Sequence, residues 1–241
     1  MELTKTAETG SASPFSALIT MFYEPAKTFA SLEHRRAAWL PLVVLMLSTA
    51  ALMTWYFNIV DFAWLMDQMF ATIKDPAARE KAAGMMSKQM MQISGIGGAL
   101  IGMPVIFALM GVYFMFAGKV QSKEFTFGKG FALAAWSSLP TLLAFPLGAM
   151  QIMLSSNGQM GFSDLNPLSL NTLFFHHPMG HPMASLFDSI SVPSIWSAVL
   201  MVIGFELWAK AKRSTAIMVV AIPYAVIYGV WLAVALMSKA A

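Results

Sequence analysis

Long apolar runs alternate with shorter polar segments along the chain. A helix needs about 20 apolar residues to cross about 30 Å of hydrocarbon. Five stretches come close to or exceed that length, at residues 39–57, within 89–118, and at 131–154, 189–208 and 215–237. The pattern therefore predicts an all-α fold, a polytopic membrane helix bundle with about five transmembrane helices.

The segment before the first run has an apolar face of its own. Ser13 and Pro14 form a typical helix start, a side-chain cap followed by a residue suited to the first turn. Four apolar side chains then recur at helical spacing: Phe15, Leu18, Ile19 and Phe22. Pro25 interrupts this helix. We expect an interfacial amphipathic helix, and the alternative is a helix packed beneath the bundle.

The loop between the first and second predicted spans also has an amphipathic segment. One apolar face is formed by Phe62, Leu65, Met66 and Met69. Asp75 and Pro76 then restart a helix, which we expect to continue from Ala77 to Met91 and into the second span. The second long loop, at residues 155–188, is rich in turn-forming residues and predicts an irregular segment.

The composition indicates lipid, and not water, as the main solvent of the chain. Hydrophobic residues make up 58% and charged residues 11%, whereas soluble domains contain about 25% charged residues. We divide the chain into an N-terminal segment, 1–38, which carries the interfacial helix, and a five-span domain, 39–238. The lipid bilayer is the expected partner. The net charge of +3 is too small to indicate nucleic acid.

Aromatic residues mark the ends of several predicted spans. Trp39 and Trp55 with Tyr56 bracket the first span, and Trp196 and Trp208 lie in the fourth. Indole and phenol rings favour the headgroup layer, because one part of the ring system is apolar and the other is polar. The alternative for each is ordinary packing within the bundle.

The distribution of Lys and Arg predicts an orientation. Ten lie before the first span or between the second and third or the fourth and fifth spans: Lys5, Lys27, Arg35, Arg36, Lys119, Lys123, Lys129, Lys210, Lys212 and Arg213. Five lie on the other side: Lys74, Arg79, Lys81, Lys88 and Lys239. Since cytoplasmic loops are enriched in these residues, we expect a cytoplasmic N-terminus and an outside C-terminus.

Small residues recur every four positions on three spans and predict close helix contacts. The stripes are Ser94, Gly98 and Gly102; Ala144 and Gly148; and Ala221, Ala225, Gly229 and Ala233. A four-residue repeat keeps these residues on one helix face. We expect these faces to contact other helices.

One cluster in the second long loop has metal-binding chemistry. It consists of His176, His177, Met179, His181 and Met183. Imidazole and thioether groups together suit copper. The loop is therefore a candidate metal site, and the alternative is a solvated loop without a ligand.

No pattern indicates an enzyme or a cofactor. Cysteine is absent, which excludes a thiolate nucleophile or a cysteine metal site. Gly95, Gly97 and Gly98 are not followed by the Lys and Ser or Thr of a phosphate loop. The sequence has no serine nucleophile elbow and no zincin His-Glu pair. We predict a non-enzymatic protein with no cofactor.

The order of features resembles the bacterial branch of the Yip (Ypt-interacting protein) domain family. The first matching motif begins at Phe15 and includes Phe22-Tyr23-Glu24-Pro25 and Thr28-Phe29. The second leads into the third span and reads Glu124-Phe125-Thr126-Phe127-Gly128-Lys129-Gly130-Phe131, followed by Ser137-Ser138-Leu139-Pro140. The resemblance implies a five-span protein of the bacterial cytoplasmic (inner) membrane.

Two functions remain open on these grounds. The resemblance favours a protein that organises the bilayer, binds other membrane proteins or self-associates. Prolines within or near the spans, including Pro104, Pro140 and Pro223, predict kinks. Together with the His/Met loop, they leave a small-solute or metal-ion conduit as the alternative.

Overall fold

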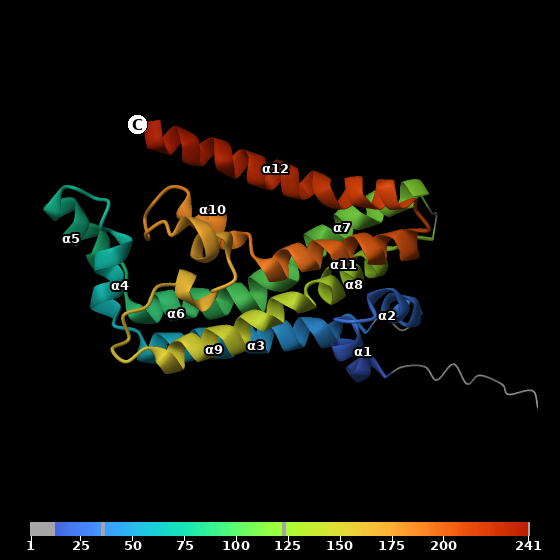
Figure 1. The fold of residues 1–241 in the computed structure, drawn as a ribbon, viewed down its shortest axis with the longest axis horizontal. Coiled ribbons are helices and arrows are strands. Elements are labelled where there is room, and N and C mark those ends of the chain that lie inside the picture. The colour runs from blue at the N-terminus through green and yellow to red at the C-terminus, as the bar shows by residue number, and fades with distance from the viewer. Residues whose placement is uncertain (1–12, 35–36, 122–123, 241) are drawn as a thin grey trace, which may run out of the picture.

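A computed structural model describes residues 13–34, 37–121 and 124–240 of the chain. These residues form helices and no strand, and one isolated antiparallel bridge joins Ser169 to Ser191. Figure 1 shows long helices side by side, with short helices at both ends of the bundle. The predicted all-α polytopic bundle is confirmed. The division between segment 1–38 and domain 39–238 stays a prediction, because residues 1–12 and 35–36 lie outside the described part.

Five helical stretches are long and apolar enough to cross a membrane. They are α3 (Trp39–Ile59); α6 (Lys88–Gly97) joined through η1 (Gly98–Gly102) to α7 (Met103–Gln121); α8 (Phe127–Ser137) joined through η2 (Leu139–Leu143) to α9 (Ala144–Leu154); α11 (Val192–Ala209); and α12 (Arg213–Ala240). The shorter helices are α1 (Pro14–Thr20), α2 (Pro25–Leu32), α4 (Phe62–Met69), α5 (Pro76–Gly84), η3 (Ser163–Leu165), η4 (Asn171–Phe175) and α10 (Ala184–Ser189). Each predicted span therefore has its helix.

Two spans change their helical winding partway along. In the second, η1 is a π-helical turn that lies just before Pro104. In the third, η2 is a 3-10 turn that contains Pro140. Proline lacks a backbone donor and crowds the carbonyl four residues earlier, so each of these two prolines favours a local change in the hydrogen-bond ladder. The Thr141 hydroxyl and amide both donate to the Ser138 carbonyl, at 2.7 and 3.0 Å, and thereby stabilise the second break.

The predicted continuous helix from Ala77 to Met91 is wrong. Helix α5 ends at Gly84, and α6 begins after Ser87. The Ser87 hydroxyl accepts the Met90 amide at 3.1 Å, so a new cap starts the second span. Gly84, which favours the end of a helix, and the capping Ser87 three residues later divide the segment into two helices.

The end of the bundle opposite the N-terminus is built around the end of α3. The predicted apolar face of α4 is confirmed, because Leu65 and Met66 are buried. The buried Tyr56 hydroxyl donates to the Met160 carbonyl at 2.9 Å and so fixes the second long loop to α3. That loop contains η3, η4 and α10, and it packs against the spans.

Helices α7 and α8 pack closely through glycine. A Cβ atom added to Gly130 would overlap the Gly111 carbonyl, and one added to Gly118 would overlap the Phe125 ring. Phe125 is fully buried and packs 5.6 Å from Phe205, centroid to centroid. Gly130 of the second family motif, together with Gly118 on α7, therefore permits a close approach that larger residues would prevent.

Helix α12 forms an outer layer of the bundle (Figure 1). In its most hydrophobic window 6% of the residues are buried, against 50% in the third span. The expected helix contacts of its small-residue stripe are wrong for the described chain, since Ala221, Ala225, Gly229 and Ala233 are all exposed. The same holds for Gly98, which has no neighbour within 4 Å of an added Cβ, whereas Gly148 contacts Leu52 as expected.

Candidate functional site

The candidate site is a hairpin of α1 and α2 at the N-terminal end of the bundle. The Ser13 hydroxyl accepts the Phe15 amide at 3.3 Å and so caps α1. Pro25 ends the turn after α1 and occupies the first position of α2, where its missing amide costs nothing. Helix α2 follows directly, so the proline that interrupts one helix begins the next.

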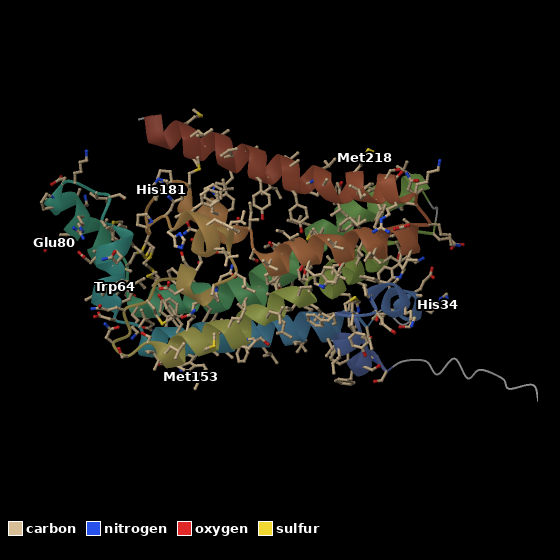
Figure 2. All side chains as sticks on the ribbon, viewed as in Figure 1. His34, Trp64, Glu80, Met153, His181 and Met218 are labelled. Carbon is tan, nitrogen blue, oxygen red and sulfur yellow. The ribbon has the colours of Figure 1, made fainter. Side chains whose placement is uncertain are left out.

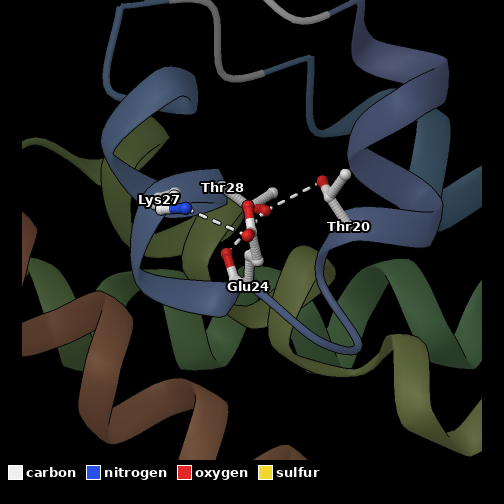
Figure 3. Close-up of polar contacts among 4 residues, drawn as sticks. All are labelled: Thr20, Glu24, Lys27 and Thr28. Carbon is white, nitrogen blue, oxygen red and sulfur yellow. Dashed lines mark hydrogen bonds and ion pairs between the residues drawn. The ribbon is translucent and has the colours of Figure 1, made fainter.

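Polar contacts hold the two short helices together (Figure 3). The Thr28 Oγ1 lies 2.9 Å from both the Thr20 Oγ1 and the Glu24 carbonyl oxygen. The Lys27 ammonium lies 2.9 Å from the Glu24 carboxylate. Thr28 is buried, whereas the Lys27–Glu24 pair is exposed. The threonine contact therefore fixes the hairpin angle, and the ion pair adds little, as is usual for exposed pairs.

The buried face of the hairpin is attached to α11 by an aromatic contact. The Trp208 Nε1 donates to the Phe29 carbonyl oxygen at 2.8 Å, and both residues are buried. Their rings meet edge to face, with centroids 5.4 Å apart. A Cβ added to Gly204 would lie 2.8 Å from the Phe29 ring, so the glycine leaves the space that this ring fills. The hairpin is thus packed against a membrane-spanning helix and is not held by its chain connection alone.

An ion pair attaches the hairpin to α8. The Lys129 ammonium lies 3.4 Å from the Glu33 carboxylate, directly after the end of α2. Lys129 is buried, and Glu33 is partly exposed. Both family motifs contribute to this contact region, because Phe29 belongs to the first and Lys129 to the second. The structure therefore brings together two motifs that lie about 100 positions apart in sequence.

The outer face of the hairpin is apolar and exposed. The exposed fractions of Phe15, Ile19 and Tyr23 are 64%, 68% and 65%. We call these three residues the outer stripe. The predicted single apolar face is therefore divided, because Leu18 and Phe22 turn towards the core while Phe15 and Ile19 turn away from it. The hairpin packs on the bundle and still presents apolar side chains outwards.

Basic side chains lie at the same end of the bundle as the outer stripe. Figure 1 places α1, α2, the end of α7 and the turn from α11 to α12 together at this end. Its exposed bases among the described residues include Lys27, Lys119, Lys210, Lys212 and Arg213. Lys5, Arg35, Arg36 and Lys123 lie outside the described residues. An apolar stripe with surrounding cations is typical of segments that lie at a membrane surface.

The tryptophans show two different outcomes. Trp39 and Trp55 are 59% and 37% exposed, as an aromatic belt predicts, whereas Tyr56 and Trp208 are buried and form hydrogen bonds inside the protein. Sequence reasoning did not identify the Trp208 contact with Phe29. A tryptophan at the end of a span fits either a position in the headgroup layer or packing inside the protein, and the neighbouring sequence does not distinguish the two. The packing of Trp208 depends on Phe29, which is distant in sequence.

The predicted metal cluster lies at the opposite end of the bundle, where Figure 2 labels His181. The rings of His177 and His181 stack with centroids 4.0 Å apart. The in-plane lone pairs of two stacked rings lie in separate, nearly parallel planes and so do not converge on one point between the rings, and the His181 Nδ1 already accepts the Met183 amide at 3.2 Å. Met179 packs instead against an apolar cluster close to Gly161.

Metal binding by this loop stays a prediction. His176 adopts a left-handed backbone conformation at the end of η4. Among the described residues, no group of three or more His, Asp or Glu side chains is placed to hold a metal ion. The structure therefore brings two of the predicted ligands, His177 and His181, together, and binding of one ion by both would require their rings to rotate.

Comparison with known proteins agrees with the motifs in this region. The model of the Yip1 domain matches residues 19–234. The chain is 24% identical over 214 residues to the membrane protein YknW of Bacillus subtilis (strain 168), a match that covers 86% of this chain and 84% of that protein. No solved structure matches.

Proposed function

The chain is therefore a member of the Yip1 domain family, and from this premise we propose that it is a non-enzymatic protein that organises the bilayer, or membrane proteins, around its N-terminal hairpin. We further propose that it lies in the bacterial cytoplasmic membrane with this hairpin on the cytoplasmic face. The excess of Lys and Arg at this end supports that orientation. The similarity to a Bacillus membrane protein supports the location.

One observation carries the proposal. The outer stripe is apolar and exposed on a hairpin that is itself fixed to α8 and α11. Burial of a large apolar side chain in an apolar environment contributes about 1.5–3 kcal/mol. Three such side chains at the same end of the bundle as exposed cations favour insertion among the headgroups of anionic lipids. Because the hairpin cannot move freely, this insertion would act on lipid at a fixed place next to the spans.

Site-directed spin labelling tests the location of the outer stripe. The chain contains no cysteine, so single cysteines can be labelled without background. In the full chain reconstituted into vesicles that contain phosphatidylglycerol, we expect a nitroxide at Ile19→Cys to be more accessible to oxygen than to a water-soluble nickel chelate. The control is Lys27→Cys, on the polar side of the hairpin, where we expect the opposite order. Equal, water-like accessibility at both sites would contradict insertion.

Lipid order tests the organising role. We expect reconstituted protein to change the order that an interfacial fluorophore reports, and we expect the triple variant Phe15→Ser, Ile19→Ser, Tyr23→Ser to lose most of that change. The matched control is Phe174→Ser, because Phe174 is 70% exposed at the opposite end of the bundle. If the triple variant and the control change lipid order as the unaltered protein does, the outer stripe does not organise lipid.

A conduit is the second candidate, because the second and third spans are both interrupted near their middles. Interrupted helices are common at transport sites. Flux of small solutes and of copper into proteoliposomes distinguishes the two functions. A conduit predicts flux above that of empty vesicles. Loss of copper flux alone after replacement of His176, His177 and His181 by Ala would assign the metal role to the loop.

A further inference from the structure

A pocket of about 250 Å³ lies inside the membrane-spanning region, between α3, the 3-10 turn η2 and residues 162–166. We call it the midspan pocket. Its wall is largely apolar, with Leu45 and Phe145 as examples, and it also contains Ser48, Thr49, Thr141 and Asn166. No charged side chain lines it among the described residues. It is separate from the N-terminal hairpin, and its wall includes residues 162–166 of the long loop that also carries the His/Met cluster.

The pocket lies at half the depth of the first span. Nine residues of α3 precede Ser48, and ten follow Thr49. At about 1.5 Å per residue, the pair lies about 14–15 Å from either end of the helix. This is the middle of a hydrocarbon layer of about 30 Å, where no bulk water is available to hydroxyl groups. The break at η2 also falls near the middle of the third span, between α8 and α9.

The Ser48 and Thr49 hydroxyls on α3 lack hydrogen-bond partners among the described residues. Hydroxyls in helices usually satisfy themselves by bonding to the carbonyl four residues earlier. Thr54 and Ser138 do so here, both at 2.8 Å, and Ser197 does so at 3.0 Å. Ser48 and Thr49, which lie nearer the middle of α3 than Thr54 does, have no such bond among the described residues. An unsatisfied hydroxyl in this layer is unfavourable, so a ligand with a polar atom would be stabilised there.

We propose that the midspan pocket binds a small uncharged amphiphile, whose hydroxyl or carbonyl oxygen accepts from Ser48 or Thr49 and whose apolar chain lies against Leu45 and Phe145. The absence of a charged lining residue excludes an ionic ligand, because an unpaired charge at this depth is very costly. The volume is just below the range typical of drug-sized ligands, which limits the occupant to a small molecule. This inference is independent of the organising role proposed for the hairpin.

Photolabelling of the full chain in lipid nanodiscs tests the pocket. The probe is octanol with a photoactivatable diazirine on its third carbon. We expect adducts to concentrate in peptides that contain residues 45–53 and 141–145, and we expect excess unlabelled octanol to compete them away. Adducts spread evenly over lipid-facing helices such as α12, without competition, would overturn the proposal.

Variants test recognition by the hydroxyls. The double variant Ser48→Ala, Thr49→Val should weaken the competition by octanol about fivefold, the effect of one hydrogen bond, because it removes both possible donors. The matched control is Thr54→Val, because the Thr54 hydroxyl is already bonded to its own helix. It makes one of the same chemical changes in the same span and should leave the competition unchanged. Equal labelling by a diazirine alkane without a hydroxyl, or equal loss in Thr54→Val, would show that the pocket merely holds a hydrocarbon chain and would overturn the proposal.

Discussion

Replacing Trp208 by Phe should release the N-terminal hairpin from the bundle. The Phe29 carbonyl is among the last four of α2, and the Glu33 amide that follows the helix donates to the Ala30 carbonyl. The Trp208 indole donates to the Phe29 carbonyl at 2.8 Å in a buried position. Phenylalanine keeps an aromatic ring but has no donor, so a buried carbonyl would lose its hydrogen bond. Such a loss costs about 1–3 kcal/mol, which raises the undocked population about fivefold to 150-fold.

Cysteine labelling measures this change. Ala17 is 1% exposed in the docked hairpin, and a cysteine placed there should react with a maleimide only when the hairpin undocks. We expect Ala17→Cys to react about fivefold to 150-fold faster when Trp208→Phe is added. Trp39→Phe is the matched control, because Trp39 is 59% exposed and forms no part of this contact. Equal reaction rates for Trp208→Phe and the unaltered chain would refute the role assigned to the indole.

Three further substitutions test the packing of the same fold. Gly204→Val should lower the free energy of unfolding by about 1–3 kcal/mol, because its side chain would enter the space of the Phe29 ring; Gly229→Val, which meets nothing within 4 Å, should have no effect in the same thermal unfolding assay. Glu33→Gln should lower the thermal midpoint more than Glu24→Gln does, because it leaves the buried Lys129 without its carboxylate, whereas the pair of Glu24 is exposed. Tyr56→Phe should speed proteolysis of the loop at residues 155–188, because it removes the hydrogen bond to the Met160 carbonyl. The control Tyr23→Phe, at an exposed position, should leave the rate of proteolysis unchanged. Similar cleavage of the two variants would contradict the role of that hydrogen bond.

The five spans could be predicted from the sequence because their cause is local. An apolar run of sufficient length must cross the membrane whatever its neighbours are. The capped start of α1 and the irregular loop before α11 follow from short-range chemistry in the same way. The break before α6 is not predicted by the Asp75-Pro76 start, because a helix start does not indicate where the helix ends; the Ser87 cap marks it.

The contacts between spans could not be predicted, because they depend on which face of each helix meets a neighbour. The small-residue stripe of α12 has the strongest four-residue repeat, and yet it is exposed, while the shorter stripe that contains Gly148 packs against Leu52. Pro140 lies in a change of winding, whereas Pro223 lies within an unbroken α12. The contact between Phe29 and Trp208 joins residues that are 179 positions apart, and no local pattern encodes it.

The sparse packing of α12 makes this helix the part of the fold best able to follow bilayer thickness. Its stretch from Arg213 to Met237 has 25 residues, so at about 1.5 Å per residue it is about 37 Å long, more than the hydrocarbon layer requires. A helix that is longer than the hydrocarbon layer is thick fits the layer by tilting. Because few of its residues are buried in the bundle, α12 can tilt further in a thin membrane and stand upright in a thick one while the other four spans keep their packing.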